Sequence, residues 1–295
     1  MSVSAVIVTY NRLGLLTEVI ESLKNGTVVP DHIIVVDNHS EQDTVDYLES
    51  LGNQIEYLRL DKNIGGAGGF NKGIRYFIEN TDDEFVWLMD DDTVTHPDTL
   101  QVLLKFAAEK QSFGFLASDV RWTDGTRAKM NNPAPKNRLK KIPEDATAAE
   151  ELMNATFVSL LMQRHIIEQI GLPITDFFIW GDDIEYTERA ARLAPGYFVP
   201  AAKVTHKMAM NVGSNIMNDS LERLPRYFYS YRNKVYYGAK RNFIGHVKSN
   251  TRITLEAIRL IFAPNVDNRL KRLSVLIKGV KAGLVFRPEI EYVEK

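Results

Sequence analysis

Short apolar runs alternate with segments of helical spacing through the first 110 residues. Four runs have the length and composition of buried strands, namely VSAVIVT (3–9), HIIVVD (32–37), IEYLRL (55–60) and FVWLMD (85–90). Helices are expected at 13–24, 41–51, 67–79 and 97–109, the last with Pro97 in its first turn. This alternation predicts an α/β fold, with a mostly parallel sheet flanked by helices.

The remainder of the chain departs from this alternation. Residues 121–149 hold Gly125, several prolines and mixed charges, which predicts a loop or a flap that orders when a ligand binds. Beyond it we expect a strand at 154–162, helices at 164–170 and 183–193, and a strand at 197–204. From about residue 220 the sequence predicts a helical extension. The expected domains are therefore 1–219 and 220–295.

Charge divides the chain at the same place. Residues 220–295 contain 16 Lys and Arg against 6 Asp and Glu, a net charge of +10, whereas residues 1–219 contain 20 against 32, a net charge of −12. An acidic main domain repels a polyanion, so a nucleic acid is not an expected partner. The chain has no cysteine, which excludes disulfides and thiolate metal sites. The first residues read as a strand rather than a signal peptide, and no apolar run is long enough to span a membrane.

Three adjacent carboxylates, Asp90-Asp91-Asp92, follow the fourth strand directly. Alternate residues of an extended segment point the same way, so Asp90 and Asp92 can share one Mg²⁺ or Mn²⁺. His206 is a good third ligand if the fold brings it near them. The alternatives are a solvated acidic turn before the next helix and a structural histidine.

The segment Trp180-Gly181-Asp182-Asp183 opens another predicted helix. One of its carboxylates could act as a general base for an acceptor hydroxyl, and Trp180 offers a flat face on which a sugar could stack. The alternatives are an acidic helix N-cap and a tryptophan of the core.

A glycine-rich stretch, NIGGAGGFNKG (63–73), precedes and enters the third helix. Its backbone N–H groups suit a phosphate or a sugar hydroxyl, although its spacing fits neither a P-loop nor a dinucleotide-binding fingerprint. The alternative is close packing of a helix on a strand.

Taken in order, the motifs resemble those of family 2 inverting glycosyltransferases. They are VTYNR (8–12), VVDNHS (35–40), NIGGAGGFNKG, WLMDDD (87–92), FFIWGDDIEYTER (177–189) and His206. The set is most similar to the galactofuranosyltransferase branch, with rhamnosyltransferases close by, and it covers about residues 3–215. The resemblance implies a GT-A fold, with a nucleotide-binding half at about 1–92 and an acceptor half at about 93–219.

The resemblance also implies a role for each motif residue. Thr9, Tyr10 and Asn11 would line the nucleotide pocket, with Asp37 on the base. Asn63, Gly65 and Gly66 would lie under the diphosphate-sugar, and Asp91 would contact ribose or sugar. Asp90, Asp92 and His206 would hold the metal. Asp183 would be the catalytic base, Asp182 would hold a hydroxyl, and Trp180 would contact the acceptor, although Gly181 shifts that tryptophan by one residue from the family pattern.

The function that follows is transfer of a hexosyl unit, galactofuranose or rhamnose being favoured, from a UDP- or dTDP-sugar. The acceptor would be a hydroxyl of a glycan or a lipid-linked glycan, in cell-surface polysaccharide assembly. A relative that binds nucleotide-sugars without turnover is one alternative. A nucleotidyltransferase is another, but that class usually carries a glycine-rich basic loop after its first strand, where this chain has TYNRLGLL.

The basic, aromatic tail has three candidate roles. It could dock a cytoplasmic enzyme on the anionic inner face of the plasma membrane, or it could build a homo-oligomer. Alternatively, the apolar stripe at 269–286 could pack on the protein's own core, with the lysines between its members left in solvent.

Overall fold

The computed structural model describes residues 1–137 and 139–293, which form two compact units. Unit 1 contains Met1–Thr175, Asp183–Val212 and the chain from Ile290 onward. Unit 2 contains Asp176–Asp182 and Gly213–Glu289. Each unit therefore includes a short piece of chain from a distant part of the sequence.

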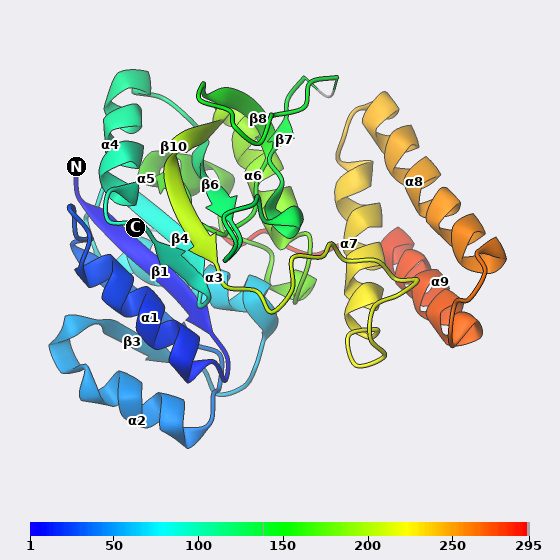
Figure 1. Ribbon diagram of the computed structural model, residues 1–295, viewed down its shortest axis with the longest axis horizontal. Helices are drawn as coiled ribbons and strands as arrows, with labels where there is room; N and C mark the ends of the chain where they lie inside the picture. The colour runs from blue at the N-terminus through cyan, green and yellow to red at the C-terminus, as the bar shows by residue number, and fades with distance from the viewer. Residues whose placement is uncertain (138, 294–295) are drawn as a thin grey trace. The chain divides into compact units, whose positions relative to one another are not determined.

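Unit 1 is built on one mixed sheet in the order β3-β2-β1-β4-β9-β6-β10-β8-β7 (Figure 1). The parallel part consists of β1 (Val3–Thr9), β2 (His32–Asp37), β3 (Glu56–Arg59) and β4 (Phe85–Asp90), together with the pair β6 (Phe115–Arg121) and β10 (Gly196–His206). The antiparallel strands are β5 (Thr93–Thr95), β7 (Ala134–Pro135), β8 (Glu150–Asn154) and β9 (Leu160–Gln163). The predicted α/β class is confirmed.

Helices cover both faces of this sheet, as predicted. They are α1 (Leu13–Lys24), α2 (Gln42–Ser50), α3 (Gly65–Asn80), α4 (Thr99–Lys110), α5 (Arg164–Ile170) and α6 (Asp182–Leu193). Residues of β1 alternate between two cores, because successive side chains of a strand point to opposite faces. Val6 and Val8 pack with α3, α5 and α6, whereas Ala5 and Ile7 pack with α1, α2 and α4. A strand buried on both faces is uniformly apolar, which explains the run in the sequence.

Two expected elements differ in the structure. The helix expected at 97–109 begins at Thr99, because the hydroxyl of Thr99 bonds to the backbone of His96 and leaves Pro97 in the turn before the helix. The single strand expected at 154–162 is wrong. β8 ends at Asn154 and β9 begins at Leu160, so residues 155–159 belong to neither strand, and Ser159 has a left-handed φ of 60°. The segment 121–149 contains a short 3₁₀ turn, η2 (Lys129–Asn131), and β7.

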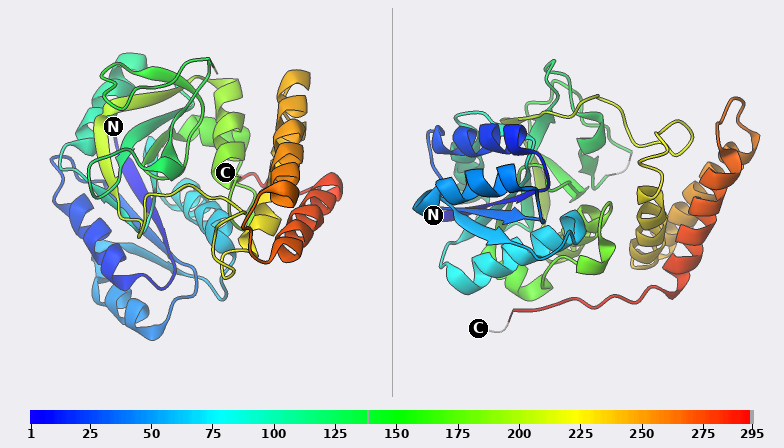
Figure 2. Two further views of the ribbon diagram at one scale, coloured as in Figure 1. Left: turned by 45° about the vertical axis from the view of Figure 1, so that its right-hand side comes forward. Right: turned by 90° about the horizontal axis from the view of Figure 1, so that it is seen from below.

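Unit 2 is helical, as the sequence predicts from residue 220 onward. It consists of α7 (Arg226–Ala239), α8 (Phe243–Phe262) and α9 (Arg269–Val285), which pack against one another (Figure 2). Their core holds Tyr227, Tyr231, Ile253, Leu260 and Leu276. Among the described residues, no helix combines the length and the apolar composition needed to cross a bilayer.

Helix α3 lies close to β1 because glycines face the strand. A Cβ at Gly73 would stand 2.4 Å from Cγ1 of Val6, and a Cβ at Gly69 would stand 2.4 Å from Cγ1 of Val8. Close helix–strand packing, the alternative interpretation of the glycine-rich stretch, therefore accounts for these two glycines.

We predict that Gly73→Ala destabilises the protein, because the added methyl forces α3 away from β1. The expected loss is about 1–2 kcal/mol of unfolding free energy, after allowing for the better helix propensity of alanine. Gly14→Ala in α1 is the matched control, since nothing lies within 4 Å of the added atom. Denaturant unfolding of both variants measures the difference, and equal stabilities would contradict the packing argument.

Candidate active site

The parallel strands bring three sequence motifs to one edge of the sheet. Thr9 ends β1, Asp37 ends β2 and Asp90 ends β4. In register, Thr9 lies opposite Asp37, and Val8 lies opposite Asp90. Ligands of open α/β sheets bind outside these carboxyl ends, so the three motifs lie where a fold of this class binds its ligands.

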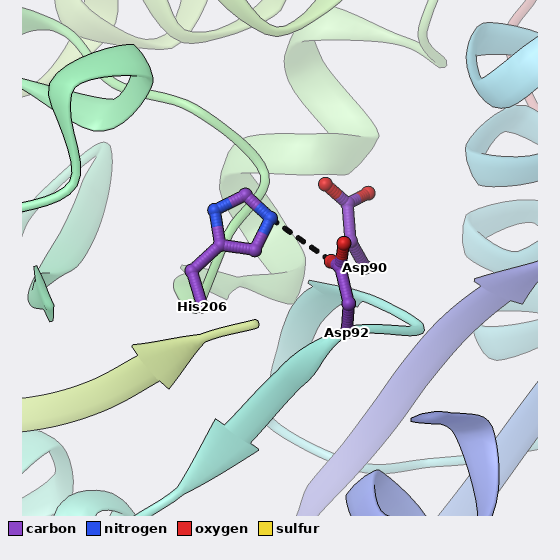
Figure 3. A group of neighbouring side chains, drawn as sticks. All are labelled: Asp90, Asp92 and His206. Atoms are coloured by element: carbon purple, nitrogen blue, oxygen red, sulfur yellow. Dashed lines mark ion pairs between the residues drawn. The ribbon is translucent and has the colours of Figure 1, made fainter. Parts of the chain in front are cut away.

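Asp90, Asp92 and His206 come together at this edge (Figure 3). Each offers one ligand atom, and the three atoms lie within 4.8 Å of one another. The short strand β5 explains this meeting. It pairs antiparallel with the end of β10, which sets His206 opposite Thr93, the residue after Asp92. Nε2 of His206 is 2.9 Å from Oδ1 of Asp92.

Burial and mutual repulsion dominate the electrostatics of the triplet. Burial, with the charge of Asp92 beside it, raises the pKa of Asp90 to about 7. Burial also raises the pKa of Asp91 to about 6, against the attraction of Arg12. For Asp92, burial is outweighed by His206 and Arg12, which hold its pKa below the ordinary value. Burial likewise opposes protonation of His206, but Asp92 and Asp90 outweigh it and raise the pKa of the imidazole.

Arg12, the last residue of VTYNR, is a member of the site to which sequence analysis gave no role. Its Nη1 lies 2.7 Å from Oδ2 of Asp92 and 3.3 Å from Oδ1 of Asp91. The signal was present in the sequence, because a basic residue shortly after a strand end can reach an acidic cluster at the neighbouring end. Arg12 offsets part of the repulsion within the triplet.

Asp91 ties the end of β1 to the end of β4. Its Oδ2 accepts hydrogen bonds from the hydroxyl of Thr9 at 2.8 Å and from the backbone N–H of Tyr10 at 3.3 Å. Thr9 is buried and Tyr10 is about half exposed. The expected contacts of these residues with ribose or nucleotide stay predictions.

Asp37 organises the turn that follows β2. Its Oδ1 accepts from the backbone N–H of Ser40 at 2.7 Å, and its Oδ2 accepts from the hydroxyl of Tyr57 at 3.1 Å. The hydroxyl of Ser40 in turn accepts from the backbone N–H of Asn11, at 2.9 Å. Asp37 is fully buried, so the structure shows a supporting role for it, and the proposed contact with the base is untested.

Asn63 and the first glycines form the entrance to α3. Oδ1 of Asn63 accepts from the backbone N–H of Gly65 at 2.8 Å, and the amide of Asn38 bonds to the backbone of Ile64 and Gly65. Gly65 has a φ of +76°, a conformation that favours glycine. A Cβ at Gly66 would meet nothing within 4 Å, so a ligand can approach the backbone there.

The motif around Asp183 lies where the two units join in sequence. Trp180, Gly181 and Asp182 belong to unit 2, and Asp183 belongs to unit 1. The Trp180 ring packs edge-on against Tyr227, with ring centroids 5.0 Å apart, and contacts the core of unit 2. Trp180 and Gly181 both have left-handed φ values, 64° and 93°. The roles expected for Asp182, Asp183 and Trp180 stay predictions.

Asn131 holds the ring of His206 and was missed by sequence analysis. Its Oδ1 lies 2.8 Å from Nδ1 of His206, and its Nδ2 donates to the hydroxyl of Thr156 at 2.9 Å. An amide oxygen only accepts, so Nδ1 carries a proton and Nε2 faces Asp92. No sequence signal could have found Asn131, because it lies in an irregular segment far along the chain from its partner.

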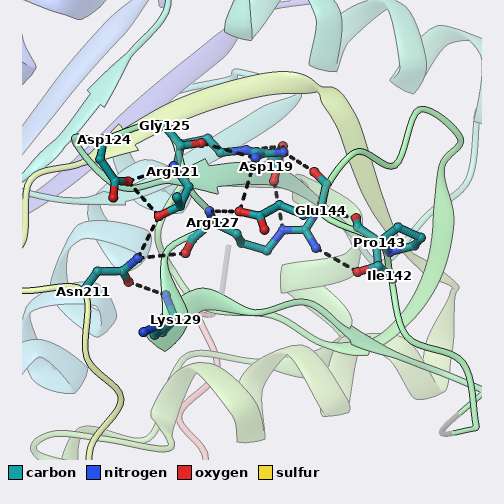
Figure 4. Close-up of polar contacts among 11 residues, drawn as sticks. Asp119, Arg121, Asp124, Gly125, Arg127, Lys129, Ile142, Pro143, Glu144 and Asn211 are labelled. Carbon is teal, nitrogen blue, oxygen red and sulfur yellow. Dashed lines mark hydrogen bonds and ion pairs between the residues drawn. The ribbon is translucent and has the colours of Figure 1, made fainter.

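A network of two arginines fastens the segment that carries Asn131 (Figure 4). Buried Asp119 on β6 accepts from Arg121 and Arg127, at 2.7 and 3.3 Å. The guanidinium of Arg127 donates to the carbonyls of Ile142 and Pro143, and that of Arg121 to the carbonyl of Glu144. The carboxamide of Asn211 accepts from the backbone N–H of Lys129. These contacts hold residues near both ends of the segment 121–149, which was expected to be a flap. Its ordering on donor binding stays a prediction.

Comparison with known proteins agrees with this geometry. The model of the family described as glycosyl transferase family 2 matches residues 4–171. Galactofuranosyltransferase GlfT1 of Mycobacterium tuberculosis is 32% identical over 198 residues, which are 65% of this chain and 65% of that relative. The low-salt glycan biosynthesis hexosyltransferase Agl10 of Haloferax volcanii is 22% identical over 273 residues, covering 88% of this chain and 78% of the relative.

Solved structures share the fold at lower identity. TarS of S. aureus superposes with a TM-score of 0.55 at 16% identity, over 97% of this chain and 44% of that one. GalNAc-T7, solved with UDP, GalNAc and Mn²⁺, superposes with a TM-score of 0.59 at 14% identity, over 80% of this chain and 50% of that one. With the motifs at the strand ends and the GT-A fold, these findings place the chain in glycosyl transferase family 2.

Proposed function

We propose that this protein is an inverting, metal-dependent hexosyltransferase that takes its sugar from a nucleotide-diphosphate donor. The observation that carries the proposal is the Asp90–Asp92–His206 cluster at the end of β4 in a family 2 fold. UDP-galactofuranose is the favoured donor, since galactofuranosyltransferases are among the relatives, and a dTDP- or UDP-rhamnose is the second choice.

The three side chains fit a divalent cation. Two carboxylates and an imidazole suit Mn²⁺ or Mg²⁺. Oδ1 of Asp92 is buried beside Nε2 of His206, 2.9 Å away, and both atoms could turn to a cation once the imidazole is neutral. When bound, the cation would stabilise the negative charge of the departing nucleoside diphosphate. Arg12 would add a positive charge beside the carboxylate oxygens of Asp91 and Asp92.

Residues at the start of α6 would act on the hydroxyl of the acceptor. Asp183 would take the proton of the acceptor hydroxyl as that oxygen attacks the anomeric carbon from the face opposite the diphosphate. Asp182 would hold a neighbouring hydroxyl, and Trp180 would contact the acceptor. Such a single displacement inverts the anomeric configuration and requires no covalent intermediate.

The acceptor is proposed to be a glycan or a lipid-linked glycan in cell-surface polysaccharide assembly. The hexosyltransferase relatives support a glycan product. The net charge of +10 on residues 220–295 supports a place at the inner face of the plasma membrane.

Release of free UDP or dTDP tests this function. We expect release from one member of a panel of UDP- and dTDP-sugars, in the presence of Mn²⁺ and stimulated by an acceptor glycan. A protein that binds nucleotide-sugars but never releases the nucleoside diphosphate would be the non-catalytic alternative.

We predict that Asp92→Ala abolishes metal-dependent binding of UDP, because it removes one ligand and the partner of His206. Calorimetric titration of UDP with and without Mn²⁺ measures the effect. Asp98→Ala, at an exposed aspartate before α4, is the matched control and should bind as the wild type does. If activity survives both EDTA and Asp92→Ala, the metal site is wrong.

We predict that Asp183→Asn lowers kcat by about a hundredfold or more while donor affinity stays near the wild-type value, because the amide cannot accept the hydroxyl proton. Steady-state kinetics and donor titration separate the two effects, with Asp145→Asn at an exposed position of unit 1 as the control. An equal loss of donor affinity would place Asp183 in the donor site instead.

We predict that Asn131→Ala weakens Mn²⁺ affinity by about tenfold or more, because the ring of His206 loses the acceptor that orients it. Asn131→Asp keeps an acceptor oxygen and should retain affinity within a few fold. The exposed neighbour Asn132 serves as control through Asn132→Ala. Titration of Mn²⁺ followed by electron paramagnetic resonance reads affinity directly, and an unchanged value in Asn131→Ala would leave Asn131 without this role.

A further inference from the structure

Helix α8 carries an apolar face that the structure leaves in solvent. It packs into unit 2 through Gly245, Ser249, Ile253 and Leu260. Its opposite side holds Phe243, Ile244, Val247, Leu255, Ile258, Ile261 and Phe262, which are between 41% and 81% exposed. At 3.6 residues per turn these positions form one continuous stripe along the whole helix, here called the α8 stripe.

Two threonines complete the α8 stripe without adding unsatisfied polar atoms. The hydroxyl of Thr251 donates to the carbonyl of Val247 at 2.9 Å, and that of Thr254 donates to the carbonyl of Asn250 at 3.0 Å. Both hydroxyls thus bond to the helix backbone four residues back. The stripe can therefore leave water at little polar cost.

Basic residues border the α8 stripe along one edge. Lys248, Arg252 and Arg259 are exposed there. The one acidic residue of α8, Glu256, accepts from the hydroxyl of Tyr231 at 2.9 Å and lies 3.7 Å from Nζ of Lys234, so it faces α7. The neighbouring helix α9 has no acidic residue and adds exposed Lys271, Lys278 and Lys281. The solvent side of these helices is thus apolar and positively charged.

We propose that α8 lies in the interface of an anionic lipid bilayer, with the α8 stripe among the acyl chains and its basic edge on the phosphate groups. An amphipathic helix of about 30 Å with a basic border binds in the plane of such a membrane. A second copy of the chain fits less well, because a symmetric contact between two α8 helices would bring like charges together. The docking surface is inferred from the residues of α8 alone. Only its purpose, which is to bring the enzyme to a lipid-linked acceptor, rests on the proposed function.

A polarity-sensitive fluorophore can report on the α8 stripe, because the chain has no native cysteine. Ile258→Cys labels the stripe, and Glu109→Cys labels an exposed position of α4 as the control. With vesicles of phosphatidylglycerol and phosphatidylcholine, we expect a blue shift for the label at 258 alone, and the shift should weaken with salt. A label at 258 that ignores anionic vesicles at low salt would overturn the proposal.

Co-sedimentation of the full chain supplies the second measurement. The combined variant Ile244→Gln, Ile258→Gln and Phe262→Gln should lower vesicle partitioning by about tenfold or more. Leu193→Gln, at an exposed apolar residue of unit 1, should not change it. Equal partitioning of the two variants would place the membrane contact elsewhere. A dimeric solution mass that the combined variant abolishes would assign the α8 stripe to a second copy.

Turnover with a short water-soluble acceptor separates this proposal from the proposed function. The combined variant should keep wild-type rates in that assay, because α8 takes no part in the chemistry. If the variant lost those rates together with vesicle binding, the α8 stripe would serve the fold rather than the membrane. Absence of turnover in the wild type, with vesicle binding intact, would overturn the proposed function and leave the docking surface standing.

Discussion

Neutralisation of the buried Asp90–Asp92 triplet is the constraint on which the site depends. Three adjacent carboxylates at the end of a buried strand repel one another, and burial adds to the cost of their charges. Arg12, from the turn after β1, and His206, from the end of β10, supply the opposing charge. Arg12 follows β1, the triplet begins at the end of β4, and His206 ends β10. The attraction between these charges therefore also holds the ends of the three strands together. A cation bound by Asp90, Asp92 and His206 would compete with protons for those atoms, which couples metal affinity to pH.

The sequence predicted what depends on local pattern. Apolar runs located β1, β2 and β4 because each strand is buried on both faces, and parallel pairing then carried their terminal residues to one edge. It could not predict contacts between residues that lie far apart in the chain. The hydrogen bond that His206 donates to Asn131 joins the end of β10 to η2, and the one that Tyr57 donates to Asp37 depends on the register of β2 and β3. The expected strand at 154–162 failed because apolar composition does not report the irregular backbone at 155–159, which ends at the left-handed Ser159.

The glycine-rich stretch shows why competing interpretations of one motif need not exclude each other. Gly69 and Gly73 face β1, where any larger side chain would collide with Val8 or Val6. Gly66, at the helix start, leaves the backbone open, whereas Gly65 has the positive φ of the turn and is hydrogen-bonded to Asn38 and Asn63. One segment thus sets the distance between helix and sheet and also leaves the backbone of Gly66 open at the helix N-terminus, where the dipole favours an anion. Close packing of the later glycines brings α3 near β1, and hydrogen bonds of Asn38 and Asn63 hold its first residues beside the end of β2.

Helices α8 and α9 show that composition alone does not reveal which face of a helix is exposed. The sequence left open whether the apolar stripe at 269–286 meets a membrane or the protein's own core. In the structure Leu276 is buried and Leu273 and Val280 pack on the core of unit 2, whereas Leu270, Ile277, Leu284 and Val285 are exposed. Helix α8 has the same mixture of basic and aliphatic residues, and its apolar stripe lies on the side away from that core. Periodicity identifies an amphipathic helix but not which of two apolar faces meets the protein, because both faces have the same spacing. Gly279 and Gly283 decide which face of α9 is interior, since they let α9 approach the α7 backbone closely on the side that carries them.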